Sequence, residues 1–145
     1  MELRRKRAYD TAASEDGLRV LVDRLWPRGL AKERAAIDLW AKDAAPSPDL
    51  RREWHAAPDA DWAVHADRYR AELADQSSAA LTVLVEQLRE HPVVTLVYAA
   101  HDEQRNHAVV LEEALRERLD SAHETDRTRG QIEHGDRSNT GQTER

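Results

Sequence analysis

The sequence predicts a single α/β domain in which a small parallel β-sheet is flanked by helices. Two runs, Val20–Val22 and Val93–Tyr98, are short and apolar at consecutive positions, as strands buried on both faces are. The chain between them has mostly helical periodicity and is long enough for a crossover between parallel neighbours. We therefore expect the two runs to pair in parallel at the centre of the sheet.

Composition narrows the class of protein. A chain of 145 residues is of one-domain length and can bury a modest core without metals or disulfides. The absence of Cys excludes disulfides, thiol nucleophiles and thiolate metal sites. No apolar run approaches the roughly 18 residues of a membrane span, and no signal-like segment follows Met1. We expect a soluble cytoplasmic protein without a membrane partner.

In the first third of the chain, the sequence predicts an edge strand before the apolar run Val20–Val22, which we call the main strand, and a helix after it. Residues 2–9 have few apolar side chains and fit an edge strand with Arg and Lys facing solvent. Residues 10–17 form a polar connection that ends at Gly17, a breaker before the main strand. From residue 31 to residue 43 the pattern turns helical, with its bulky apolar residues on one side.

Three further helices follow from capping signals and apolar stripes. Ser47 and Pro48 are placed as N-cap and first residue of a helix to His55. A helix of about 17 residues begins at Pro58, and another, after residue 78, ends before Pro92. Their apolar stripes are Trp62, Ala66, Tyr69 and Leu73, and Leu81, Leu84, Val85 and Leu88.

The end of the chain contains one more helix and then changes in composition. After the second strand, an apolar face is formed by Ala108, Leu111, Leu115 and Leu119. From residue 120 onward Ile132 is the only large aliphatic residue, so little surface can be buried to offset ordering entropy. We assign residues 1–119 to the domain and residues 120–145 to a disordered polar tail.

Polar side chains follow both apolar strands. Because the carboxyl ends of parallel strands meet at one edge of a sheet, the two loops are expected to form one site. The first loop offers Asp23, Arg24, Trp26, Arg28 and Gly29, and the second offers His101, Asp102, Asn106 and His107.

These residue types favour an anionic small molecule, such as a phosphate compound or a nucleotide, as the ligand. Arginine is a planar, bidentate donor, and a helix N-terminus carries free N–H groups and partial positive charge. We expect ligand contacts from Arg24, Trp26, Arg28, Gly29, His101 and Asn106. If chemistry takes place, His107 is the candidate proton carrier with Asp102 as its partner, and Asp23 is a third catalytic candidate. No glycine-rich phosphate loop is present, and whether the protein uses a cofactor is left open.

Each of these residues also fits a purely structural role. Asp23 is equally suited to capping a turn or pairing with a neighbouring arginine. Trp26 is suited to packing, Asp102 to capping a helix, and His107 to packing as a neutral imidazole. The sequence leaves these alternatives open, and with them the question of whether the protein is an enzyme.

Other functional classes are less well supported. His101, Asp102 and His107 could supply metal ligands, but their spacing matches no standard zinc pattern, so no metal is predicted. A nucleic-acid-binding or regulatory module is the main alternative, because residues 4–7 and the Trp/Arg loop suit phosphate contacts and base stacking. The net charge of −6 argues mildly against indiscriminate nucleic-acid binding. A protein-interaction role and the oligomeric state remain open.

Several motifs resemble the YeaO-like family of small bacterial proteins, catalogued as a domain of unknown function. They are KRAYD at 6–10, RVLVDRLWPRGL at 19–30, W-x-K-D-x-A-P-S-x-x-L-R at 40–51, D-R-Y-R-x-E-L at 67–73 and LVYAAHDEQRNHAVVLEEAL at 96–115. The resemblance spans nearly all of residues 4–119 and implies an α/β domain in a bacterial cytoplasm. It implies no established activity.

Longer relatives in the wider family resemble this chain at two of the candidate site residues. They carry an Asp-Val-Arg-like motif, matched here by Asp23, and a Cys-His-Arg motif where this chain has Asn106, His107 and Ala108. The Cys and the Arg are not matched, so the resemblance carries no thiol- or metal-dependent activity over to this chain.

Overall fold

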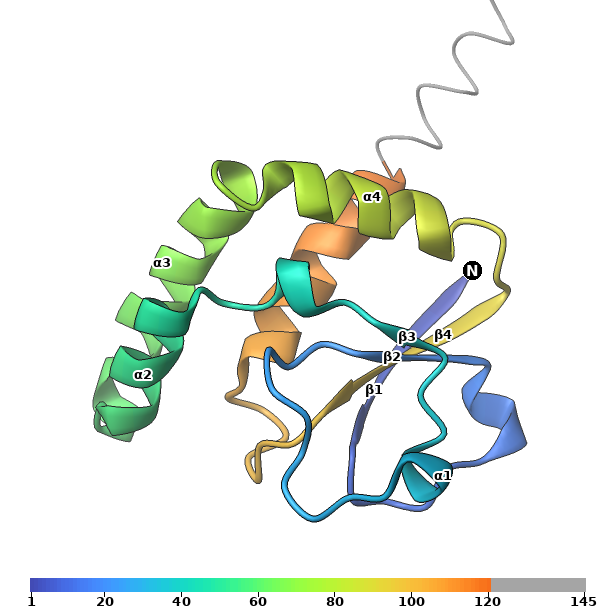
Figure 1. Ribbon diagram of the computed structural model, residues 1–145. Coiled ribbons are helices and arrows are strands. Elements are labelled where there is room, and N and C mark those ends of the chain that lie inside the picture. Colours follow the sequence, from blue (N-terminus) through green and yellow to red (C-terminus); the bar gives the residue numbers. More distant parts are fainter. Residues whose placement is uncertain (121–145) are drawn as a thin grey trace, which may run out of the picture.

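The computed structural model describes residues 1–120 and contains a four-stranded, all-parallel sheet (Figure 1). Its strands, in the spatial order β1-β4-β2-β3, are β1 (Glu2–Arg7), β4 (Val93–Tyr98), β2 (Leu18–Leu21) and β3 (Leu39–Trp40). The predicted parallel pairing of the two apolar runs is confirmed, with Leu18 opposite Val94 and Leu21 opposite Val97. β1 lies at an edge, as predicted. The predicted α/β fold class is therefore confirmed.

Helices join the strands and follow the last one. They are α1 (Lys32–Ala35), α2 (Pro48–Ala56), α3 (Trp62–Ala74), α4 (Ser78–Leu88) and a helix over residues 107–120, with short 3-10 turns at Ser14–Asp16, Lys42–Ala44 and Asp59–Asp61. Figure 1 shows α2, α3, α4 and helix 107–120 together on one side of the sheet and α1 apart from them. No helix within residues 1–120 is long and apolar enough to cross a membrane.

The larger core lies between the sheet and these four helices. The sheet contributes Leu3, Val20, Val22, Val94, Leu96 and Tyr98. The predicted helical stripes face it, because Ala66, Tyr69 and Leu73 of α3 are buried, as are all four stripe residues of α4. Helix 107–120 buries Ala108, Leu111 and Leu115 against the same core. Burying aliphatic and aromatic side chains on one stripe of each helix is the main stabilising term in a layered fold of this kind.

The opposite face of the sheet is covered by a smaller apolar cluster and by buried polar groups. Leu21, Val97, Ala8, Leu30 and Ala35 form the cluster, with Tyr9, Trp26 and Ile37 packed against it. On the same face Arg19 and Thr95 are buried. The main strand is thus buried on both faces, as its apolar run predicted.

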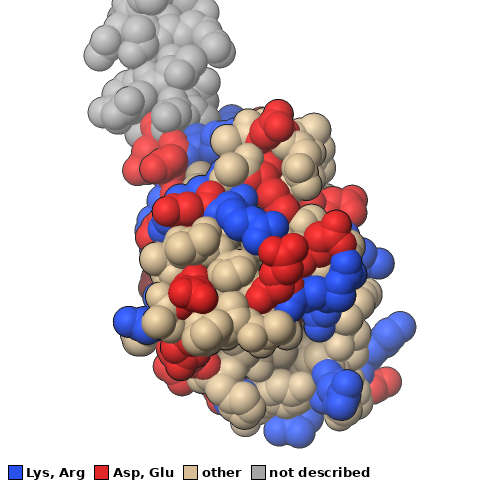
Figure 2. All heavy atoms as spheres, turned by 90° about the vertical axis from the view of Figure 1, so that its left-hand side faces the viewer, with Lys and Arg blue, Asp and Glu red and all other residues tan. Residues whose placement is uncertain are grey.

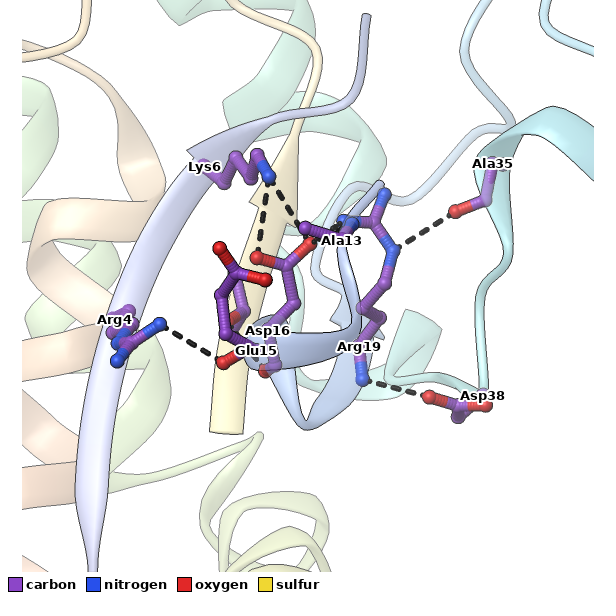
Figure 3. Close-up of polar contacts among 9 residues, drawn as sticks. Arg4, Lys6, Ala13, Glu15, Asp16, Arg19, Ala35 and Asp38 are labelled. Atoms are coloured by element: carbon purple, nitrogen blue, oxygen red, sulfur yellow. Dashed lines mark hydrogen bonds and ion pairs between the residues drawn. The ribbon is translucent and has the colours of Figure 1, made fainter. Parts of the chain in front are cut away.

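The buried polar groups on this face are held by the 3-10 turn before β2 (Figure 3). Asp16 accepts hydrogen bonds from Arg19 Nη1 at 2.7 Å, from Lys6 Nζ at 3.1 Å and from the backbone N–H of Ala13 at 2.9 Å. Burial raises the pKa of the Asp16 carboxyl, but these three donors outweigh burial and hold the pKa below its usual value. The Thr95 hydroxyl donates to Asp16 O at 2.7 Å and ties the turn to β4.

The predicted helix over residues 31–43 is wrong. Only Lys32–Ala35 is helical, because Ala36 adopts a left-handed conformation with φ of 49° and ends the helix. The following residues instead form β3, where Leu39 and Trp40 pair with Val20 and Leu21. β2 pairs with β4 along one edge, and pairing of Leu39 and Trp40 with its other edge outweighs the weak helical periodicity of this segment.

Two further predictions concern the start of α3 and the end of the chain. The helix predicted from Pro58 starts as a 3-10 turn, and its α-helical part begins at Trp62. The predicted polar tail lies outside the described residues, apart from Asp120 at the end of helix 107–120.

Candidate functional site

The loops after β2 and β4 meet at the carboxyl edge of the sheet and, together with α2, enclose a cavity of about 460 Å³. A volume of this size is within the range of small-molecule sites, roughly 300–1,000 Å³. The cavity is lined by Tyr9, Asp23, Arg24, Leu25, Trp26, Pro27, Arg28, Pro46, Arg51, Trp54, His55, Ala57, Pro58, Asp59, Trp62, Ala99, Ala100, Arg105, Asn106 and His107.

Asp23 joins the two loops. Its Oδ2 accepts a hydrogen bond from the backbone N–H of Ala99, at 3.0 Å, so the loop after β2 is tied to the first residue after β4. Its Oδ1 lies 2.9 Å from Nε2 of His107 and accepts no hydrogen bond from residues 1–120. Most of the carboxylate is buried, with 16% of the side chain exposed. Asp23 therefore lines the cavity at the point where the two loops are joined.

His107 is the first residue of helix 107–120 and is held by three neighbours. Its Nε2 lies 3.1 Å from the carbonyl oxygen of Val22, and because a carbonyl only accepts, the proton is on Nε2. That proton is directed at Val22, so the contact with Asp23 is electrostatic. The ring packs edge-on against Tyr69, with centroids 6.3 Å apart. Tyr69 in turn donates its hydroxyl to Ala44 O at 2.5 Å, and burial raises its pKa.

The other predicted residues of the second loop do not converge on His107. Asp102 accepts hydrogen bonds from the backbone N–H groups of Gln104 and Arg105, which lower its pKa. It does not line the cavity, and the carboxylate beside His107 is Asp23 instead. The expected pairing of His107 with Asp102 is therefore corrected.

His101 and Asn106 have other partners. His101 is exposed outside the cavity, with Nδ1 at 3.4 Å from Nη2 of Arg7. Asn106 lines the cavity but is buried and caps helix 107–120. Its Oδ1 accepts from the N–H of Val109 at 3.3 Å, and its Nδ2 donates to Asp102 O at 2.7 Å. Its amide is thus already engaged at both ends.

Within the first loop, Arg24 and Trp26 wall the cavity while bonding to the protein. Arg24 Nε donates to Pro46 O at 2.9 Å, which joins the loop to the segment before α2. Trp26 Nε1 donates to Leu30 O at 2.7 Å, and its ring meets Trp40 edge-on at 5.6 Å. Both residues hold the shape of the loop as well as line the cavity.

Arg28 and Gly29 lie at the exposed end of the same loop. Arg28 lines the cavity, and its backbone carbonyl accepts from the Tyr9 hydroxyl at 2.9 Å. Gly29 has φ of 75°, a conformation that glycine adopts without a steric penalty. It is not among the lining residues, so its role in this loop is in the turn.

Among the lining residues that the sequence did not single out, four come from α2 and from the end of the second loop. Arg51, Trp54 and His55 lie on one face of α2 at i, i+3 and i+4, and Arg105 precedes the cap of helix 107–120. The i, i+3, i+4 spacing was visible in the sequence. That this face turns toward the two loops depends on how α2 packs, which no local pattern specifies.

Positive charge predominates around the cavity. Four arginines line it, against two aspartates, Asp23 and Asp59. Within residues 1–120, the side chains of three of these arginines, Arg28, Arg51 and Arg105, make no hydrogen bond or ion pair, although Arg24 is bonded to backbone carbonyls. Unpaired guanidinium groups around a concave site attract anions.

The outer surface beside the cavity differs from this lining. Figure 2 looks onto the side of the molecule that carries α2 and α3 and shows acidic and basic side chains interspersed. Ion pairs such as Arg68 with Glu53 and Arg70 with Glu113 contribute to this mixture. This side of the molecule therefore has no broad surface of one sign.

Comparison with known proteins identifies a family and relatives that match most of the chain. The model of the family described as "Inactive DUF488-N3 subclade" matches residues 2–131. The chain is similar to "Uncharacterized protein YeaO" of Escherichia coli strain K12, with 41% identity over 116 residues, which are 80% of this chain and 98% of that protein. It is also similar to "Uncharacterized protein Rv3073c" of Mycobacterium tuberculosis strain H37Rv, with 43% identity over 109 residues, 75% of this chain and 89% of that protein. No solved structure matches the chain.

Proposed function

The chain belongs to the DUF488 family, within its inactive DUF488-N3 subclade, and from the lining of its cavity we propose that it is a binding protein for a small anionic molecule of the phosphate or nucleotide type. The membership agrees with the resemblance drawn from the sequence motifs. The ligand would lie in the cavity between loops 23–29 and 101–107 and helix α2.

The unpaired arginines of the cavity carry this proposal. Arg28, Arg51 and Arg105 come from three different segments and line one volume. Arg28 and Arg105 are exposed and Arg51 is half-buried, whereas Arg24 is bonded to backbone carbonyls. Three guanidinium groups without such partners in residues 1–120 favour an external anion as the partner.

Aromatic side chains give the cavity a surface suited to a flat ligand group. Trp26, Trp54 and Trp62 all line it. Trp54 packs on Trp62 and on Tyr69, with centroids 6.0 and 6.1 Å apart, so its ring is held rigidly. Rigid indole faces bind bases and other planar groups by stacking, which supports a nucleotide-like ligand over a bare inorganic anion.

The contacts of Asp23 and His107 favour binding over catalysis. The Nε2 proton of His107 is directed at the carbonyl of Val22, and one oxygen of Asp23 is bonded to Ala99 N. Both groups therefore serve the junction of the two loops. The description of the subclade as inactive points the same way. A proton-transfer role for His107 remains a prediction, for which Asp23 is the nearer carboxylate.

The alternative of a nucleic-acid-binding module has less support. The basic residues at 4–7 are bonded within the protein: Arg4 to Glu15 O, Arg5 to Glu112 and Arg7 to Ala100 O. Cations already bonded in this way are poor starting points for phosphate contacts. A salt-dependent gel shift with short nucleic acids tests this alternative, since no binding at low salt removes it.

A thermal-shift screen with nucleotides and phosphorylated metabolites tests the main proposal. A ligand at 100 times its Kd adds about 2.7 kcal/mol to the stability of the folded state, so a hit is readily detected. Titration calorimetry of each hit should then show weaker binding by the double variant Arg28→Gln, Arg105→Gln. The control is Arg52→Gln, because Arg52 is exposed on α2, pairs with Asp49 and does not line the cavity. The proposal fails if no compound binds, or if the double variant binds each hit as tightly as the parent protein does.

A further inference from the structure

We propose that Arg51 and His55 of α2 form the oxyanion subsite of this cavity, and that His55 holds a tetrahedral oxyanion in its protonated form. This inference rests on the proposed function and assigns the charged end of the ligand to one helix face. The recognised group is a phosphate or sulfate type of oxyanion, either free or carried by an ester.

The geometry of α2 places the two side chains together. Arg51 and His55 are four residues apart on a nine-residue helix, and both line the cavity. Residues four apart lie one above the other on a helix face. Within residues 1–120, neither side chain makes a hydrogen bond or an ion pair with the protein, so both are available to an external acceptor.

The position of α2 is fixed independently of any ligand. Ser47 caps the helix by accepting from Leu50 N at 3.2 Å, and it is bonded through its own hydroxyl and backbone N–H to Glu72 of α3. Leu50 of α2 is fully buried in the larger core. The subsite is therefore built on a rigid element, and its two donors need no rearrangement of the backbone to bind.

The position of His55 at the end of α2 stabilises its protonated form, whereas the side chains around His55 destabilise that form. His55 lies in the last turn of α2, where the helix dipole stabilises positive charge. His55 is largely exposed. In the free protein, partial desolvation lowers its pKa, the nearby charges of Arg51 and His107 lower it further, and Asp23 opposes them. The remaining charged residues around the cavity are Arg24, Arg28, Asp59 and Arg105.

A bound oxyanion reverses this balance. Its negative charge between Arg51 and His55 offsets the repulsion that disfavours the imidazolium, and each oxygen is an acceptor for an N–H donor. Binding of the anion and uptake of a proton by His55 are then coupled, and by linkage each strengthens the other. The expected consequence is oxyanion binding that strengthens as the pH falls toward the pKa of His55.

Histidine NMR on the full chain tests this subsite with sulfate and phenyl sulfate as probes. Neither probe titrates near neutral pH, so any proton uptake belongs to the protein. Saturating probe should raise the pKa of His55 by about one unit, which corresponds to about tenfold tighter binding to the protonated form. His91, which follows α4, is the internal control, because it does not line the cavity. Sodium chloride at matched ionic strength controls for screening.

Single substitutions on α2 test which side chains bind the oxyanion. Arg51→Gln and His55→Gln should each weaken sulfate binding several-fold, and His55→Gln should in addition make the affinity independent of pH near neutrality. The adjacent Arg52→Gln is the matched control and should leave both properties unchanged. Tighter binding of phenyl sulfate than of sulfate would identify an ester as the preferred source of the oxyanion.

The outcomes separate this inference from the proposed function. If the probes shift resonances of cavity residues while the pKa of His55 stays constant, the anion binds elsewhere in the cavity and the subsite is wrong. The same conclusion follows if Arg51→Gln and Arg52→Gln bind alike. If neither probe binds and the metabolite screen is also negative, the proposed function itself fails.

Discussion

The carboxylate of Asp23 accepts a hydrogen bond from the backbone N–H of Ala99 at 3.0 Å. This bond connects the second residue after β2 to the first residue after β4. The two strands are already paired in parallel, so the bond extends their junction beyond the sheet into the loops. Asp23 and Ala99 both line the cavity, so the bond lies where the two loops meet.

Replacement of Asp23 should therefore cost stability as well as ligand binding. Asp23→Ala leaves the N–H of Ala99 without its acceptor in a partly buried position, which costs about 1 kcal/mol or more of unfolding free energy. Urea denaturation measures the loss. Asp59→Ala is the control, because Asp59 also lines the cavity and is exposed, and it should change the free energy by less than about 0.5 kcal/mol. Equal losses in the two variants would contradict the role of Asp23 in joining the loops.

The buried carboxylate of Asp16 makes stability depend on acid pH. Its pKa is lowered in the folded state, because hydrogen bonds from Ala13, Lys6 and Arg19 outweigh the effect of burial. A group with a lowered folded-state pKa contributes stability that is present above its unfolded value, 3.8, and is lost as the pH falls through the folded-state pKa. Unfolding free energy should therefore decline as the pH is lowered below about 4.

The variant Asp16→Asn isolates this contribution. It leaves Arg19, which is itself buried, without its ionic partner, and removing one member of a buried pair costs about 3 kcal/mol or more. The remaining acid dependence of stability should be shallower than in the parent. Urea denaturation as a function of pH gives both quantities. A variant with the same acid dependence as the parent would show that Asp16 does not titrate as described.

Two glycines with positive φ should respond differently to alanine. Gly17 has φ of 65°, and a Cβ there would lie 2.2 Å from the carbonyl oxygen of Val93. Gly29 has φ of 75° and no atom within 4 Å of such a Cβ. We expect a cost of about 3 kcal/mol or more for Gly17→Ala, from steric overlap added to backbone strain, and about 1 kcal/mol for Gly29→Ala, from strain alone. Thermal unfolding of both variants checks the difference, which similar costs would contradict.

The central elements of the fold could be predicted because their sequence patterns are strong and local. Runs of branched residues identified β2 and β4, and stripes at helical spacing identified α3 and α4. β3 was missed for the opposite reason. It consists of Leu39 and Trp40 only, and its strand conformation comes from pairing with β2, a tertiary contact that outweighs local preference.

The candidate site could be predicted in part, because its position follows from the two strands that the sequence identified. Residues after two adjacent parallel strands must lie at one edge of the sheet, so the meeting of Asp23 with the second loop follows from topology. The partner of His107 did not follow, because Asp102 is turned toward the backbone of its own loop. The contribution of α2 could not be predicted either, since it depends on the packing of α2 against α3 through Ser47 and Glu72.

The most direct test of anion binding in the cavity is an NMR titration of the backbone amides of the full chain with adenosine monophosphate. We expect saturable shifts that are concentrated on loop 23–29, loop 101–107 and the last turns of α2, and that are weakened in Arg51→Gln but not in Arg52→Gln. Shifts confined to other surfaces, or the absence of saturable shifts at any amide, would contradict a nucleotide-type ligand at this site.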